Sequence, residues 1–256
     1  MRTQTERPAA PSVLDQFVDV GLMQLSNWRW SWRAMVVTGV FTPLMSIIAL
    51  GSFARSSGHQ ALVYVLTGSI VLALMFENQN KVAQNFAYMK AMGTLDFFGT
   101  LPVRRYIIIL STVLAFFVLS IPSVLVTLFV GSQVLDIDVT VSPLVALVIP
   151  LCVLPLAGIG AIIGVVSRTQ EEASSFTLML TILMLFLGPV IIPADRLPDW
   201  LIAVSHFSPT KYAASAMRQV LVGPVTGQVW VDIAVLAVVT VVTLWFAGSR
   251  MQWKAK

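Results

Sequence analysis

The chain has 256 residues, of which 57% are hydrophobic and only 11% are charged. A soluble globular domain carries about 25% charged residues, so this composition excludes a solvated domain, a disordered chain and a disulfide-stapled secreted module. A membrane protein remains. The net charge of +4 is typical of membrane proteins whose cytoplasmic loops face anionic lipid, and we expect no nucleic-acid partner.

The first expected element is an amphipathic helix over residues 12–33. Its apolar residues recur at three- and four-residue steps, and Ser12 followed by Asp15 is typical of a capping box. Trp28 and Trp32 lie near its end, as in helices anchored in a membrane interface. The sequence therefore predicts a helix lying in the inner interface, with a soluble helix packed on a partner as the alternative.

Six long stretches without a charged residue follow, and each is a candidate membrane span because about 20 residues cross the hydrocarbon core. The expected spans are about 34–54, 60–78, 106–135, 139–167, 173–194 and 229–249. With a cytoplasmic N-terminus, 12 of the 16 lysines and arginines lie on the inner side, as the positive-inside rule requires. We expect a cell (inner) membrane protein with both termini in the cytoplasm.

Several kinds of chemistry are missing from the sequence. No glycine precedes a lysine, so the chain has no Walker A loop for ATP phosphates. The two histidines lie outside the expected spans without cysteine pairs, so we expect no metal site and no catalytic residues. No charged residue falls inside the six uncharged stretches around which the expected spans are drawn, residues 34–54, 60–76, 106–135, 139–167, 173–194 and 233–249, and this argues against an ion-coupled transporter. Any energy for transport must come from a partner.

The expected cytoplasmic loop, residues 77–105, has an apolar cluster. Leu95, Phe97, Phe98 and Leu101 occur together there, with Asp96 among them and Arg104 and Arg105 after Pro102. One interpretation is a short helix that docks into a groove on a partner. The other is that these residues pack against the inner ends of the bundle itself, and the spacing leaves both open.

The expected outer region, residues 195–228, follows Gly188 and Pro189. Prolines interrupt two helical stretches that are too short to span. The pattern favours a re-entrant hairpin dipping in from the outer face, and the alternative is an amphipathic surface loop. We expect Arg218 to hold an outer gate, with Asp195 and Asp199 as its nearest acidic candidates. The alternative for Arg218 is snorkelling to lipid headgroups.

Together these features resemble the permease subunit of type-2 ATP-binding-cassette (ABC) exporters. Positions of that family's C-terminal signature fall here on Thr181, Met184, Leu187, Gly188, Val190, Leu197, Pro198, Pro209, Thr210, Tyr212 and Arg218. The family's coupling segment resembles Gly93, Thr94 and Leu95, followed by Pro102, Arg104 and Arg105, with Phe98 between them. Asp96 stands where the family usually has glutamate.

The resemblance implies a single all-α membrane domain over residues 1–256. It would have six transmembrane helices, the N-terminal interfacial helix, a coupling loop and the outer re-entrant hairpin between spans 5 and 6. It also implies a separate ATPase subunit that binds ATP and magnesium, a second permease copy as homodimer or related heterodimer, and no cofactor bound by this chain. The expected substrate is an amphiphilic drug, a lipid-like molecule or a glycan.

Two other functions compete with export. One is a non-transport membrane scaffold or assembly factor that binds a cytoplasmic partner through residues 77–105. The other is an ion-coupled secondary transporter, which the charge-free spans disfavour. In the fourth expected span, Gly160 and Gly164 have the small-xxx-small spacing of closely packed helices. We expect that contact within the chain, although a contact between protomers has the same pattern.

Overall fold

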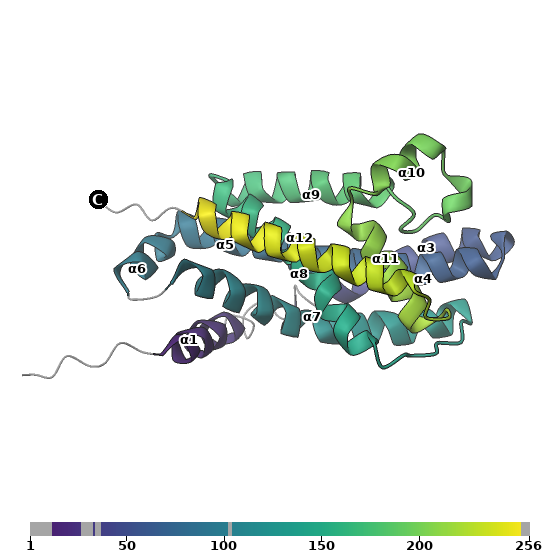
Figure 1. The fold of residues 1–256 in the computed structure, drawn as a ribbon, viewed down its shortest axis with the longest axis horizontal. Helices are drawn as coiled ribbons and strands as arrows, with labels where there is room; N and C mark the ends of the chain where they lie inside the picture. Colours follow the sequence, from purple (N-terminus) through teal and green to yellow (C-terminus); the bar gives the residue numbers. More distant parts are fainter. Residues whose placement is uncertain (1–11, 27–32, 34–36, 102–103, 252–256) are drawn as a thin grey trace, which may run out of the picture.

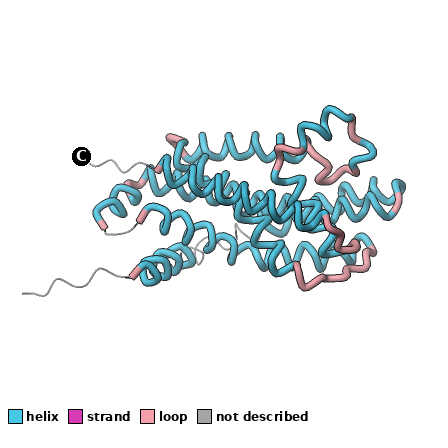
Figure 2. The backbone as a smooth tube through the Cα atoms, viewed as in Figure 1, coloured by secondary structure: helices cyan, strands magenta, loops and turns pink. Residues whose placement is uncertain are grey.

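The computed structural model describes residues 12–26, 33, 37–101 and 104–251, and in these ranges it consists of helices and their connections, without a strand (Figure 2). Five helices of the described chain are long and apolar enough to cross a membrane. They are Gly39–Ser57, His59–Ala91, Arg105–Leu135, Val145–Val166 and Gln228–Arg250.

The α-helices lie side by side in an elongated bundle (Figure 1). In chain order they are α1 (Val13–Ser26), α3 (Thr42–Ala54), α4 (His59–Leu74), α5 (Lys81–Ala91), α6 (Thr94–Thr100), α7 (Arg105–Leu135), α8 (Val145–Val166), α9 (Gln170–Phe186), α10 (Asp199–Ser205), α11 (Pro209–Leu221) and α12 (Gln228–Arg250). One end of the bundle holds α6 and the last turn of α12, and the other holds α10. We name them the α6 end and the α10 end (Figure 1).

The second long helix runs past the expected boundary at residue 78. A π-helical segment, Met75–Asn80, joins α4 to α5, so the helix continues from His59 to Ala91. The expected loop over 77–105 is therefore helical up to residue 91. The charged residues do not end the helix because Lys81 Nζ binds Glu77 Oε1 one turn earlier, at 2.7 Å. The pair satisfies its own charges inside the bundle.

The fifth expected span, 173–194, forms a shorter helix than the sequence predicts. α9 has 17 residues and ends at Phe186, just before Gly188 and Pro189. At 1.5 Å per residue it is about 26 Å long, less than the hydrocarbon core of a typical bilayer. The five longer helices agree with five of the six expected spans, and the count of six stays a prediction.

Helix α1 forms where the amphipathic helix was expected, at residues 13–26; residues 27–32 lie outside the described chain. Its capping box is confirmed, because Ser12 Oγ accepts from Asp15 N at 3.1 Å and Asp15 Oδ2 accepts from Ser12 N at 3.1 Å. The helix packs on α7 with Gln16, Val20 and Gln24 buried. Its apolar residues Leu14, Val18, Leu22 and Met23 face outward, an arrangement that suits contact with lipid.

Helix α8 lies among the other helices and contacts α12, α5, α11 and α7. Its contact with the π-helical segment and α5 leaves no room for a side chain at Gly160 or at Gly164. A Cβ atom at Gly160 would collide with the carbonyl oxygen of Gln79, and one at Gly164 with that of Ala83. The glycine pair therefore lets two helix backbones touch within one chain, as the sequence analysis favoured.

We expect Gly160→Ala to destabilise the protein by about 1–3 kcal/mol, because the added methyl group must push two backbones apart. Gly248→Ala in α12 is the matched control, since the nearest atom to its added Cβ is a side-chain carbon at 4.0 Å. That change should be neutral or slightly stabilising. Thermal unfolding of both variants in detergent tests this, and equal melting temperatures would contradict the close backbone contact.

Candidate functional site

The expected coupling segment forms the short helix α6 at one end of the bundle. Gly93 precedes it with φ +69°, a left-handed conformation that glycine adopts without strain. The turn at Gly93 reverses the chain after α5, and Thr94 is the first residue of α6. Asp96 lies in the first turn, where a negative charge suits the helix dipole. Pro102 lies outside the described residues.

The structure places the apolar residues of the cluster in two environments, some buried against the bundle and some exposed. Leu95 and Phe98 are 6% and 5% exposed and pack into the bundle, beside residues of α5, α7 and α8. Phe97 is 61% exposed and Leu101 39% exposed. Leu95 and Phe98, expected as partner anchors, thus hold α6 on the bundle. The exposed residues of α6 and the position after it are Asp96, Phe97, Gly99, Thr100 and Leu101.

Two basic side chains tie helix ends together beside α6. Lys90 Nζ donates to the carbonyl oxygens of Val165, at 3.0 Å, and Ser167, at 2.9 Å, at the end of α8. Arg105 donates to the carbonyl oxygen of Met251 after α12, at 2.9 Å. Cations are favourable at helix C-termini, where carbonyl groups lack helical partners. These contacts tie α5 to the end of α8 and α7 to the end of α12.

A cavity of about 370 Å³ opens between α6 and the ends of α8 and α12. It is lined by Lys90, Leu95, Asp96, Val165, Val166, Arg250 and Met251. Arg104, on the neighbouring connection, donates to the hydroxyl of Tyr106 at 2.8 Å. The α6 end of the bundle thus presents charged groups and apolar walls together, as a protein-docking surface does.

Several signature residues of the region expected to be re-entrant lie where the end of α9 meets α10 and the start of α11. We name this junction the elbow. Pro198 precedes α10 and Pro209 is the first residue of α11, a position that suits proline. Thr210 Oγ1 donates to the carbonyl oxygen of Met184 in α9 at 3.1 Å. Tyr212 donates to the carbonyl oxygen of His206 at 3.0 Å. A Cβ at Gly188 would lie 3.3 Å from that of Ser205, so the end of α9 also contacts α10.

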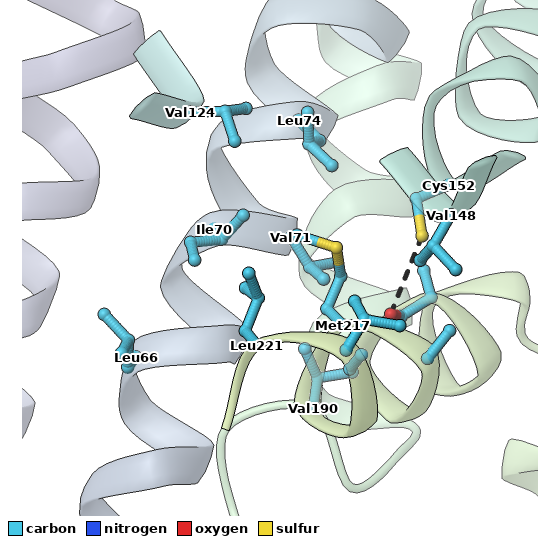
Figure 3. Close-up of a cluster of buried hydrophobic side chains, with 14 of the residues drawn as sticks. Leu66, Ile70, Val71, Leu74, Val124, Val148, Cys152, Val190, Met217 and Leu221 are labelled. Atoms are coloured by element: carbon cyan, nitrogen blue, oxygen red, sulfur yellow. Dashed lines mark hydrogen bonds between the residues drawn. The ribbon is translucent and has the colours of Figure 1, made fainter. Parts of the chain in front are cut away.

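Helix α11 lies with its apolar face against the bundle. Figure 3 shows Met217 and Leu221 of α11 beside Ile70 and Val71 of α4, in a cluster that also contains Cys152 of α8. The thiol of Cys152 contacts the carbonyl oxygen of Ala213 at 3.7 Å. α11 thus packs on α4, α8 and α12, three helices long enough to cross the membrane.

Arg218 of α11 lies beside Tyr64 of α4. Its guanidinium carbon is 4.0 Å from the centre of the Tyr64 ring. Burial lowers the pKa of Arg218, while Tyr64 and Asp232 act in the opposite direction, and the guanidinium stays charged. The expectation that Asp195 or Asp199 is its acidic neighbour is wrong: both are exposed, and Asp232 of α12 is the acidic group that acts on Arg218.

Sequence reasoning missed a buried polar layer around the π-helical segment. Glu77, Asn78 and Gln79 are 0–2% exposed, and π-helical turns are frequent at functional sites. Thr177 of α9 donates to Asn80 at 2.9 Å, which ties α9 to the same layer. The uncharged stretch of the second expected span stops at residue 76, so Glu77 and Lys81 were assigned to the flank and the loop that follow it. The i, i+4 spacing of that pair was the available signal.

Comparison with known families agrees with this geometry. A family described as ABC-2 type transporter matches residues 20–222 of the chain. The chain belongs to this family.

The chain is therefore the permease component of an ABC transporter and a multi-pass membrane protein, not a catalytic unit. Membership implies an ATPase partner and usually a dimer. A search of curated proteins finds no match to the chain. The matched range includes α6, the elbow at α10 and Arg218, and it ends before α12.

We expect Glu77→Gln to lower the free energy of unfolding of this permease by about 3 kcal/mol, because Lys81 would be left without its partner in a mostly buried place. Lys81→Gln together with Glu77→Gln removes both charges and should recover much of the loss. Thermal unfolding in detergent should show the single variant roughly 6–12 °C below wild type. A double variant no better than the single one would contradict a stabilising ion pair.

A second experiment tests whether α10 and α11 form a re-entrant hairpin. In a Cys152→Ala background, single cysteines from Ser205 to Val222 are labelled with a membrane-impermeant thiol reagent from each side. Protection should deepen and then recover along the segment, with all labelling from the α10 side. Labelling of the middle positions from the α6 side would show that the segment crosses the membrane.

Proposed function

We propose that this permease is the membrane subunit of an ATP-driven exporter. It moves an amphiphilic drug, lipid-like or glycan substrate outward and takes its energy from a separate ATPase subunit that docks on α6. The observation that carries the proposal is the division of α6 into a buried face and an exposed one. Leu95 and Phe98 fix the helix to the bundle. Phe97 is exposed, and the ring contact described for it is with its neighbour Phe98.

The placement of charges supports a cytoplasmic α6 end. Lys90, Arg104, Arg105, Arg168 and Arg250 all lie in helix ends or connections at the α6 end. On the other side, the described chain has Arg55 and Arg196 in connections at the α10 end, with Lys211 and Arg218 in α11. This asymmetry follows the positive-inside rule. Both termini then lie in the cytoplasm of a cell whose inner membrane holds the protein.

The partner supplies ATP and magnesium binding in this proposal. The chain has no Walker A sequence, so ATP hydrolysis belongs to a subunit that contacts α6 from the cytoplasm. Two copies of the permease, or this chain and a related one, would enclose the path, because the exposed sides of α3, α9 and α12 are apolar and can pack together or against lipid. The transported molecule passes the elbow at α10 and α11 last, where Arg218 acts as part of an outer gate.

A membrane scaffold that only binds a partner through residues 77–105 is the second candidate. It shares the docking surface of α6 with the exporter, so partner binding alone does not separate the two. ATP-dependent uptake of a fluorescent amphiphile into inverted membrane vesicles separates them, because an exporter moves the amphiphile into the lumen and a scaffold gives no uptake.

We expect Phe97→Ala to weaken co-purification of an ATP-binding-cassette ATPase about 5- to 100-fold, the loss that follows from removing an apolar anchor worth about 1–3 kcal/mol. Its folding stability should change by less than about 0.5 kcal/mol because the side chain is exposed. Phe98→Ala is the matched control on the same helix. It should cost about 3–5 kcal/mol of stability because that ring is buried.

Quantitative mass spectrometry of complexes purified from membranes gives the first readout, and thermal unfolding gives the second. Equal ATPase recovery with Phe97→Ala and wild type would contradict docking on this face of α6.

A further inference from the structure

Helix α11 has a polar side with four residues, of which the proposed gate uses only Arg218. Lys211, Ser215, Arg218 and Gln219 follow one another at positions i, i+4, i+7 and i+8, so they share one side of the helix. All four are partly exposed, while the opposite side is fully buried. We define these four residues as the α11 polar face. It holds two cations at the side of helices that span the membrane.

Arg218 has hydrogen-bonding capacity that no described residue uses. Its Nη1 atom is buried and has no acceptor. The Tyr64 ring covers the flat side of the guanidinium at 4.0 Å, which leaves the N–H groups at its edge. A buried donor without an acceptor costs free energy, so an acceptor from outside the chain is favoured at this place.

Asp232 contacts the neutral residues of the α11 polar face, Gln219 and Ser215, and makes no ion pair with its two cations. Its Oδ2 accepts from Gln219 Nε2 at 3.2 Å and its Oδ1 accepts from Gln228 Nε2 at 3.1 Å. Both carboxylate oxygens are thus engaged by neutral groups, the two amides and the hydroxyl of Ser215. Arg218 makes no ion pair with Asp232 or any other described acidic residue, and neither does Lys211. Two cations near one engaged carboxylate leave a net positive charge.

We infer that the α11 polar face is a binding site for the anionic group of an amphiphile, with Arg218 as the main ligand and Lys211 as a second positive charge. The guanidinium fork suits a phosphate or carboxylate, which it binds through two parallel hydrogen bonds. This inference rests on the proposed function, because it gives the exported molecule a charge: an anionic amphiphile in preference to a cationic or neutral one.

Native mass spectrometry of the full chain in phosphatidylcholine nanodiscs tests the site, with dodecyl phosphate as the anionic probe and dodecyl maltoside as the neutral one. Wild type should bind the phosphate in preference. Arg218→Gln should weaken phosphate binding about ten- to a hundredfold, the value of a charge-assisted hydrogen bond, and Arg218→Lys should retain part of it. Asp232→Asn should tighten binding several-fold, because it removes the nearby negative charge.

Arg196→Gln is the matched control. It removes the same charge from the α10 end, where Arg196 is exposed and donates to Ser57, and it should leave phosphate binding unchanged. An equal loss in Arg196→Gln and Arg218→Gln would overturn the site, because general surface charge would then explain the binding. Equal binding of both probes would overturn it too, as would unchanged binding in Arg218→Gln. If Arg218→Gln does not fold, the Asp232→Asn result decides.

Phosphatidylglycerol added to the nanodiscs identifies the source of the anion. Continued binding of dodecyl phosphate in these discs supports a transported amphiphile, and its displacement supports a lipid headgroup at the same site. The assay contains neither ATP nor a partner subunit. Failure of anion binding therefore leaves the α6 docking results standing, and failure of docking leaves the binding results standing.

Discussion

The direct contact between the backbones of α8 and α5 is the constraint on which the rest of the bundle depends. It exists because Gly160 and Gly164 have no side chains where the two helices meet. α5 leads directly into the turn at Gly93 and α6, and Lys90 ties its last turn to the end of α8. α8 in turn packs on α11 and α12. This contact thus connects α6 at one end of the bundle, through α5 and α8, to α11 toward the other.

Neighbouring groups compensate the charges of Glu77, Lys81 and Asp232 inside the described bundle. Glu77 and Lys81 neutralise each other within one helix turn, and the pair allows a polar layer to lie among apolar helices. Asp232 is held by two glutamine amides. Arg218 differs, because an aromatic ring covers its face but no acidic group contacts it. The uncompensated charge therefore lies beside the path proposed for the substrate and not in the structural core.

Sequence reasoning located helices well where their ends meet water. α7 and α12 begin or end at Arg105 and Arg250 because a solvated charge is stable only outside the hydrocarbon. The same rule failed at Glu77, since Lys81 satisfies that charge inside the helix. It also overestimated α9, which ends at Phe186 before a glycine and a proline that a count of uncharged residues ignores.

The candidate site could be predicted only in part, for a related reason. The segment 93–105 was found because its apolar residues are adjacent in sequence, but which of them face the bundle depends on the turn at Gly93. The partners of Arg218 could not be found from nearby residues. Tyr64 lies in α4 and Asp232 in α12, and only the insertion of α11 between these helices brings them to the arginine.

The central claim is that α6 transmits energy from a separate ATPase through its exposed face. A photo-crosslinking amino acid placed at Phe97, with the same group at Phe98 for comparison, tests this in intact membranes. The account predicts that irradiation joins position 97 to an ATP-binding-cassette protein identified by mass spectrometry, while position 98 gives crosslinks within the chain only. Absence of an ATPase adduct at position 97, or equal ATPase adducts at both positions, would contradict it.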